Sequence, residues 1–477
     1  MSSDMGAPAI DARVVIGAMI IKHKLKLDDR ETIETIRENM YMQYFLGLKE
    51  YTYEDIFDRS LFTTLRYRLG ADKFDAMTRQ IILRSEKKEE AAKKDLNDFG
   101  NDVVMNKLNS CDEEVDIKEN EELKGRATEE EPVKNKGKLI MDATVADQMI
   151  AYPTDFGLLS RSREESERLI DELCKKLDIK DKPRTYRRLA RKQYLNLSKK
   201  KNKSKKEIRK GIGQQLRYLR RNLKTIDNLL DTAEGMSFPL EHRDQRIYWV
   251  IQHIYEQQDQ MYKEHTHSID NRIVNIYQPY VRPIVRGKDK AQVEFGAKLG
   301  VSIQNGYARI NTLSWEAYNE GTDLKKQVEA YKRLNGCYPE VVITDKIYGT
   351  RENRQWLKEL GIRYSGKPLG RPSSGSQTQY RKRKQKIEQG MRNQVEGKFG
   401  QGKNGYNLNK VRARTLKTSE SWIATIFFVM NLIRFGKEFL FSFLKEVLSS
   451  FFFVYEIFSG SKMNICYQKL NDFFTKP

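Results

Sequence analysis

The apolar positions of the first part of the chain recur at helical spacing. Over residues 12–47 they recur every three or four residues, which predicts a helix, a turn and a second helix with an aspartate N-cap at Asp28 or Asp29. Leucines stand at every fourth position of residues 61–69 and predict a further helix, which Gly70 should end.

These helices predict a small all-helical N-terminal domain over residues 1–97. Helix-turn-helix units often bind DNA, but a helical bundle without any ligand has the same pattern. The pattern alone leaves both functions open. Residues 98–136 are polar and strongly acidic, so we expect an acidic flexible linker after this domain.

The pattern changes near residue 138, where short apolar runs alternate with helical stretches. The run "KLIMDATVA" predicts a buried strand, and residues 164–265 are almost continuously helical and charged. The later runs that alternate between strand and helix cover 271–315, 323–334, 339–349, 352–360, 362–366 and 380–399. This order predicts an α/β fold class, a mixed-sheet domain over residues 137–435 with a helical insertion at about 156–268.

An apolar C-terminal tail, residues 436–477, follows this domain. Its most apolar stretch carries Lys445, Glu446 and Glu456, and each of these charges is costly at the centre of a bilayer. The first ten residues also lack the charged and apolar regions of a signal peptide. We therefore expect no membrane partner, and a tail helix that is buried in a core or an interface.

The charge of the chain favours a polyanion as partner. The sequence has 87 Lys and Arg residues against 66 Asp and Glu residues, for a formal net charge of +21. Nucleic acid is favoured over an anionic membrane because the basic residues occur in blocks. Two blocks suit contacts to phosphates, although a solvated face is the commoner role of such runs. Their candidate DNA-binding residues are Lys199, Lys200, Lys201, Arg381, Lys382 and Arg383.

The four cysteines, at positions 111, 174, 337 and 466, form no CxxC pair, and the five histidines form no HExxH motif. These spacings exclude the common zinc-finger and haem-attachment motifs. Reduced thiols in a cytosolic protein fit best.

Three carboxylates stand at positions that suit metal chemistry. Asp142 is expected to end the first strand, Asp345 to end a later strand, and Glu396 to lie on a late helix. An open α/β sheet places its chemistry at the carboxyl ends of strands, and Mg²⁺ prefers oxygen ligands. Arg392 lies four residues before Glu396 and should share its helix face, where the alternative is a surface ion pair. Lys403 follows seven residues after Glu396, near the end of that helix or past it.

These residues stand in motifs that resemble those of DDE insertion-sequence transposases. "LIMDATVADQ" resembles the first-aspartate motif of that family, and "EVVITDKIYGTRENRQWLKELGI" resembles the second. The spacing of Arg392, Glu396 and Lys403 is similar to the family signature, but Gln389 stands where the signature has tyrosine. The segment 278–298, with the candidate DNA contacts Arg282 and Arg286, also resembles this group. Residues 41–70 resemble its InsH-like N-terminal domain.

The resemblance implies a ribonuclease H-like catalytic domain. Asp142 would then bridge two Mg²⁺ ions, or Mn²⁺ in their place, while Asp345 and Glu396 would each hold one. The implied reaction is cleavage of DNA at terminal inverted repeats and transfer of the freed strand to target DNA. It further implies a homodimer or larger assembly on DNA, in a bacterial cytoplasm and associated with the nucleoid.

Three other functions stay open. A catalytically inactive transposase-derived protein would bind DNA without metal chemistry. A ribonuclease H-like nuclease would cut DNA without strand transfer. A tyrosine or serine recombinase would form a covalent protein–DNA link, which the metal-dependent reaction does not need.

Overall fold

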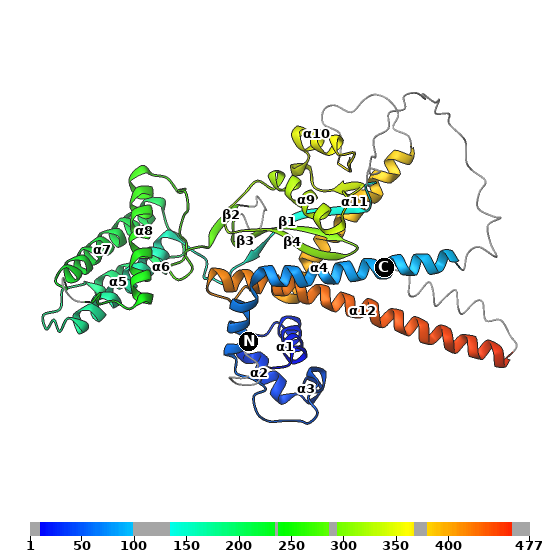
Figure 1. Ribbon diagram of the computed structural model, residues 1–477. Helices are drawn as coiled ribbons and strands as arrows, with labels where there is room; N and C mark the ends of the chain where they lie inside the picture. Colours follow the sequence, from blue (N-terminus) through cyan, green and yellow to red (C-terminus); the bar gives the residue numbers. More distant parts are fainter. Residues whose placement is uncertain (1–9, 99–133, 234–236, 286–292, 367–378, 460–477) are drawn as a thin grey trace.

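The computed structural model describes residues 10–98, 134–233, 237–285, 293–366 and 379–459 (Figure 1). The fold is mixed α/β. One mixed sheet is flanked by helices, and a separate group of helices projects to one side of it. The predicted acidic linker, apart from its first residue and its last three, lies outside the described residues.

The N-terminal helices are α1 (Ala12–Leu25), α2 (Asp29–Glu38), α3 (Met40–Leu46) and α4 (Ser60–Asp98). Asp28 is the N-cap of α2, which confirms one of the two predicted positions. Its side chain accepts from the Glu31 backbone N–H, and the Glu31 carboxylate accepts in return from that of Asp28. Gly70 interrupts α4 with φ 63° and ψ 178°, a conformation that suits glycine alone. The predicted break is therefore confirmed, but the helix resumes after it and reaches Asp98.

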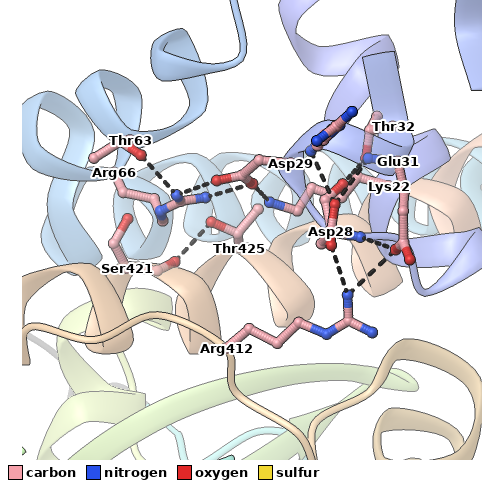
Figure 2. Close-up of polar contacts among 11 residues, drawn as sticks. Lys22, Asp28, Asp29, Glu31, Thr32, Thr63, Arg66, Arg412, Ser421 and Thr425 are labelled. Atoms are coloured by element: carbon pink, nitrogen blue, oxygen red, sulfur yellow. Dashed lines mark hydrogen bonds and ion pairs between the residues drawn. The ribbon is translucent and has the colours of Figure 1, made fainter. Parts of the chain in front are cut away.

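A buried ion cluster joins the N-terminal helices to the last helix, α12 (Leu416–Ser459). Lys22 of α1 and Arg66 of α4 both donate to the carboxylate of Asp29 (Figure 2). The Lys22 ammonium also lies 4.1 Å from the centre of the Trp422 ring on α12. Just before α12, Arg412 pairs with the two carboxylates of the α2 capping box (Figure 2).

Helices α4 and α12 lie side by side along much of their length (Figure 1). Phe74 packs on Phe428 between them, with ring centres 5.6 Å apart. Arg309 of β4 (Tyr307–Ser314) pairs with Asp75 of α4, with Nε 2.9 Å from the carboxylate. The N-terminal helices therefore share a hydrophobic core with the sheet, and the division at residue 97 stays a prediction.

The sheet combines antiparallel and parallel strands. β1 (Lys138–Asp147) pairs antiparallel with β3 (Val293–Gln304), and both β2 (Arg282–Val285) and β4 pair antiparallel with the other edge of β3. On the opposite side β1 pairs in parallel with β5 (Val341–Ile343), which pairs in parallel with β6 (Arg363–Tyr364).

The prediction that β1 ends at Asp142 is wrong, because β1 continues to Asp147. β1 pairs with β5 only over residues 138–140, whereas its pairing with β3 extends to Asp147. Asp142 therefore lies just beyond the part of β1 that has a neighbour on both edges. A similar correction applies to residues 271–281, which precede β2 and contain no strand.

The two faces of β1 point to different helices because alternate residues of a strand face opposite ways. Leu139 and Met141 pack with residues of α9 (Leu324–Asn335) and α10 (Arg351–Glu359). Ile140 belongs instead to the core that contains Val395 of α11 (Gln379–Gly400). Asp142 is on the Ile140 face of β1 and therefore on the side of α11. The predicted helices at 323–334, 352–360 and 380–399 are confirmed as α9, α10 and α11.

A helical insertion stands between β1 and β2, close to its predicted bounds. Its helices are α5 (Asp155–Lys176), α6 (Arg187–Ser198), α7 (Lys205–Asp231) and α8 (His242–Glu264). Leucine and isoleucine side chains of α5, α7 and α8 form a core of their own. Arg163 is buried in this insertion, and its guanidinium donates to Glu167 at 2.6 Å and to Gln215 at 3.2 Å.

The last helix, α12, extends into the predicted apolar tail as far as Ser459. Among the described residues, no helix combines the length and the apolar character that are needed to cross a membrane. The remainder of the tail, residues 460–477, lies outside the described part of the chain.

Candidate active site

The three predicted acids stand on three elements around the carboxyl-end edge of the sheet, where the paired parts of β1 and β5 end. Asp142 is partly buried on β1, and its carboxylate accepts a hydrogen bond from the backbone N–H of Ala143 at 2.8 Å. Asp345 follows the end of β5 by two residues and caps a short 3-10 helix, η2 (Lys346–Tyr348). Glu396 is exposed on α11.

Arg392 links two of these acids. One guanidinium nitrogen lies 3.3 Å from the Asp345 carboxylate and the other lies 2.9 Å from the Glu396 carboxylate. Arg392 and Glu396 share a helix face as predicted, and they form the ion pair that was the alternative, but Arg392 also pairs with Asp345 off that helix. Through Arg392, α11 is tied to the loop that follows β5.

The pKa of Asp142 indicates which charges surround its carboxyl group. Burial raises this pKa above the usual range, and the negative charges of Glu320 and Asp345 raise it further. The Ala143 hydrogen bond and the positive charge of Arg392 oppose the shift. The charges of Asp345 and Arg392 therefore both act on the Asp142 carboxyl group. Arg392 interacts with all three acids.

Glu320 is a fourth acid near this edge, and the sequence did not predict it. It begins the 3-10 helix η1 (Glu320–Asp323), and its carboxylate pairs with Lys298 of β3 at 3.0 Å. Beside it, the buried hydroxyl of Tyr348 has no hydrogen-bond partner among the described residues. Burial and the charges of Glu320 and Asp142 raise the pKa of Tyr348. Nothing in the sequence around Glu320 distinguishes it from an ordinary loop acid.

The donor types of this edge suit a hard divalent cation. Carboxylate oxygens are the ligands that Mg²⁺ and Mn²⁺ prefer, and Asp142, Asp345 and Glu396 supply only such oxygens. In the described residues, however, no group of three or more Asp, Glu, His or Cys side chains is arranged to hold a metal ion. The Arg392 guanidinium lies between two of the acids and offsets their charge.

Lys403 lies apart from the three acids. It belongs to a short π-helical segment, η3 (Gln401–Gly405), just past the end of α11, where the sequence predicted it. Its ammonium lies 3.5 Å from Glu294 and 3.8 Å from Asp147, near the far end of β1. Its expected contact to DNA stays a prediction.

The other predicted DNA-binding residues are scattered over the molecule. Arg282 is largely buried on β2 and pairs with Glu316 at 3.3 Å. Lys199, Lys200 and Lys201 are exposed between α6 and α7, and Arg383 is exposed on α11. Arg286 and the side chains of Arg381 and Lys382 lie outside what the structure describes.

Two family models match separate parts of the chain. A model described as "Transposase DDE domain" matches residues 342–433, and one described as "Transposase domain (DUF772)" matches residues 1–68. Together they support a DDE-type insertion-sequence transposase. The first span contains Asp345 and Glu396, whereas Asp142 lies outside both spans.

One curated protein that the chain is similar to is "Uncharacterized protein ORF8 in nfe locus" of Rhizobium meliloti. The two are 32% identical over 78 residues, which are 16% of this chain and 38% of that protein. The chain thus covers well under half of the relative's length. No solved structure matches the chain.

Proposed function

We propose that this protein is a DNA transposase that cuts at the terminal inverted repeats of its element and joins the freed strands to target DNA. The observation that carries the proposal is the position of Asp142, Asp345 and Glu396 around Arg392 at one sheet edge. The two transposase family matches, at residues 1–68 and 342–433, support the same function.

A ribonuclease H-like fold is the finer form of this proposal. Three antiparallel strands, β4, β3 and β1, are followed across the sheet by the parallel strands β5 and β6. This strand order and the helix α11 on the Asp142 side of the sheet are what we expect of that fold. The helical insertion after β1 accounts for the long sequence separation of Asp142 and Asp345.

Asp142, Asp345 and Glu396 would together hold the catalytic ions, two Mg²⁺ or Mn²⁺ in our proposal. Bound there, the metal supplies Lewis-acid activation of the attacking water or 3′ hydroxyl and of the phosphodiester. Arg392 offsets the negative charge that the acids build up. Its forked guanidinium also suits a phosphate oxygen, because it cannot lose its proton and can donate two hydrogen bonds at once.

The remaining parts of the proposal concern DNA and assembly. The N-terminal helices would read the inverted repeat, and Lys403 with the basic runs at 199–201 and 381–383 would contact phosphates. Because two element ends must be processed together, we expect a homodimer or larger assembly on DNA. The reaction would take place on the bacterial chromosome, in the cytoplasm and associated with the nucleoid.

The test uses the full chain, Mg²⁺ and duplexes that carry the ends of its own element. We expect a cut at the inverted repeat, a free 3′ hydroxyl, and products in which this strand is joined to target DNA. Cutting without joined products would indicate a nuclease instead. Binding without any cut in Mg²⁺ or Mn²⁺ would indicate a catalytically inactive DNA-binding protein, and a covalent protein–DNA adduct would indicate a recombinase of another class.

A further inference from the structure

The helical insertion carries a basic surface that is separate from the candidate active site. Between residues 184 and 224, which span α6 and most of α7, Glu207 is the only acidic residue among many lysines and arginines. Nearly all of these basic side chains are exposed. Most acidic residues of the insertion lie instead on α5 and α8, and Figure 1 shows the whole insertion to one side of the sheet.

Within this basic surface, two arginines are held against one tyrosine. The guanidinium carbons of Arg184 and Arg221 each lie 4.5 Å from the centre of the Tyr186 ring. Among the described residues, no carboxylate is within ion-pair distance of either guanidinium. By contrast, the neighbouring Arg187 is paired with Asp171 at 2.8 Å. Arg184 and Arg221 therefore rest on the Tyr186 ring, and neither is paired with a carboxylate in the described part of the chain.

The backbone of Tyr186 is unusual for an aromatic residue. Its φ of 55° and ψ of 21° lie in the left-handed region, which non-glycine residues adopt at a cost. In this conformation the ring contacts both Arg184, which precedes α6, and Arg221, which lies in the second half of α7. Strained conformations of this kind persist where the surrounding structure holds them and often accompany function.

We propose that Arg184, Tyr186 and Arg221 form a phosphate clamp through which the insertion binds the backbone of duplex DNA. This inference rests on the proposed action on DNA and assigns a second DNA-contacting surface to the protein. Phosphate contacts, rather than stacked bases, fit the geometry because two guanidinium groups already lie against the ring. An extended basic surface with few acids is also the electrostatic pattern that duplex DNA attracts.

The test is a binding titration of the full chain with a short labelled duplex of arbitrary sequence, in EDTA and over a series of salt concentrations. For the double variant Arg184→Gln/Arg221→Gln we expect weaker binding at every salt concentration. Each lost phosphate contact removes about 0.9 from the slope of log affinity against log salt, so the slope should become shallower by about 1.8. The matched control is Lys175→Gln/Lys176→Gln, which removes the same charge from the last turn of α5 and should leave the slope near that of the parent protein.

Tyr186 variants test the clamp itself. Tyr186→Phe keeps the ring and should bind as the parent protein does. Tyr186→Gly accepts the left-handed backbone without strain but frees both arginines, so it should lose affinity although thermal melting shows an intact fold. Equal salt slopes for the parent and the double arginine variant would overturn the clamp while leaving the proposed function in place. Failure of the parent protein to bind any duplex would count against the proposed function itself.

Discussion

Because Lys22 is buried, its contribution to the free energy of unfolding should rise with pH in the alkaline range. Only 2% of its side chain is exposed, and burial lowers its pKa from 10.5 to about 8, despite the favourable charge of Asp29. In the unfolded chain the ammonium keeps its proton up to its ordinary pKa. Between pH 8 and 10.5 the unfolded state therefore binds more protons than the folded state, and the contribution of Lys22 to stability rises with pH.

The size of this effect follows from the shift. Each unit of pKa corresponds to about 1.4 kcal/mol, so the Lys22 contribution should increase by about 2 to 3 kcal/mol between pH 7 and pH 10. Other groups titrate in the same range, so the quantity to measure is a difference. It is the free energy of unfolding of the parent protein minus that of Lys22→Met, from urea denaturation at several pH values.

The free energy of unfolding of the parent protein should rise relative to that of Lys22→Met as pH rises, because only the parent releases this proton in the folded state. Lys24→Met is the matched control, since Lys24 is exposed on the same helix. Its difference from the parent should stay flat over the same range. A flat or falling difference for Lys22→Met would refute the argument that burial between α2, α4 and α12 controls the pKa of this lysine.

Three further predictions concern stability and the candidate site. Gly70→Ala should destabilise the protein by about 1 to 3 kcal/mol in urea denaturation, because alanine is strained at φ 63°, whereas Gly436→Ala within helical α12 should be neutral or stabilising. Arg163→Ala should cost about 3 to 5 kcal/mol in the same assay, because it leaves a buried glutamate without its partner. A cost near zero would show that the buried pair is not needed. Arg392→Gln should move the acidic limb of the pH profile for DNA cleavage to higher pH, because loss of the guanidinium raises the pKa of Asp142 further; an unmoved limb would separate Arg392 from that carboxyl group.

The sequence predicted the elements whose signals are local. The bounds of α9, α10 and α11 agree with the structure to within a residue, because each helix shows its apolar spacing within its own sequence. The N-cap at Asp28, one of the two predicted positions, and the break at Gly70 likewise depend on a few adjacent residues. The helical insertion between β1 and β2 was also predicted, since the charged helical pattern of this segment differs from the runs on either side.

Features that depend on distant partners were mispredicted or missed. β1 continues past Asp142 because it pairs with β3, which lies about 150 residues further along the chain. Glu320 approaches the candidate site because η1 packs on η2, and the Asn353 side chain of α10 donates to the Gly321 carbonyl of η1 at 2.7 Å and to the Tyr348 carbonyl of η2 at 2.8 Å. The contact of α4 with α12 likewise joins opposite ends of the sequence. No local pattern carries this information.

The most direct test of the central claim is DNA cleavage by Asp142→Asn in Mg²⁺, with element-end duplexes as substrate. Asparagine keeps the size of the side chain but removes its charge. Glu352→Gln is the control, since this exposed acid on α10 pairs only with Lys325 in the described structure. We expect Asp142→Asn to bind the duplex as the parent protein does and to give no detectable cut, while Glu352→Gln cuts normally. Cleavage by Asp142→Asn at the rate of the parent protein would contradict the assignment of Asp142 to a metal-dependent active site.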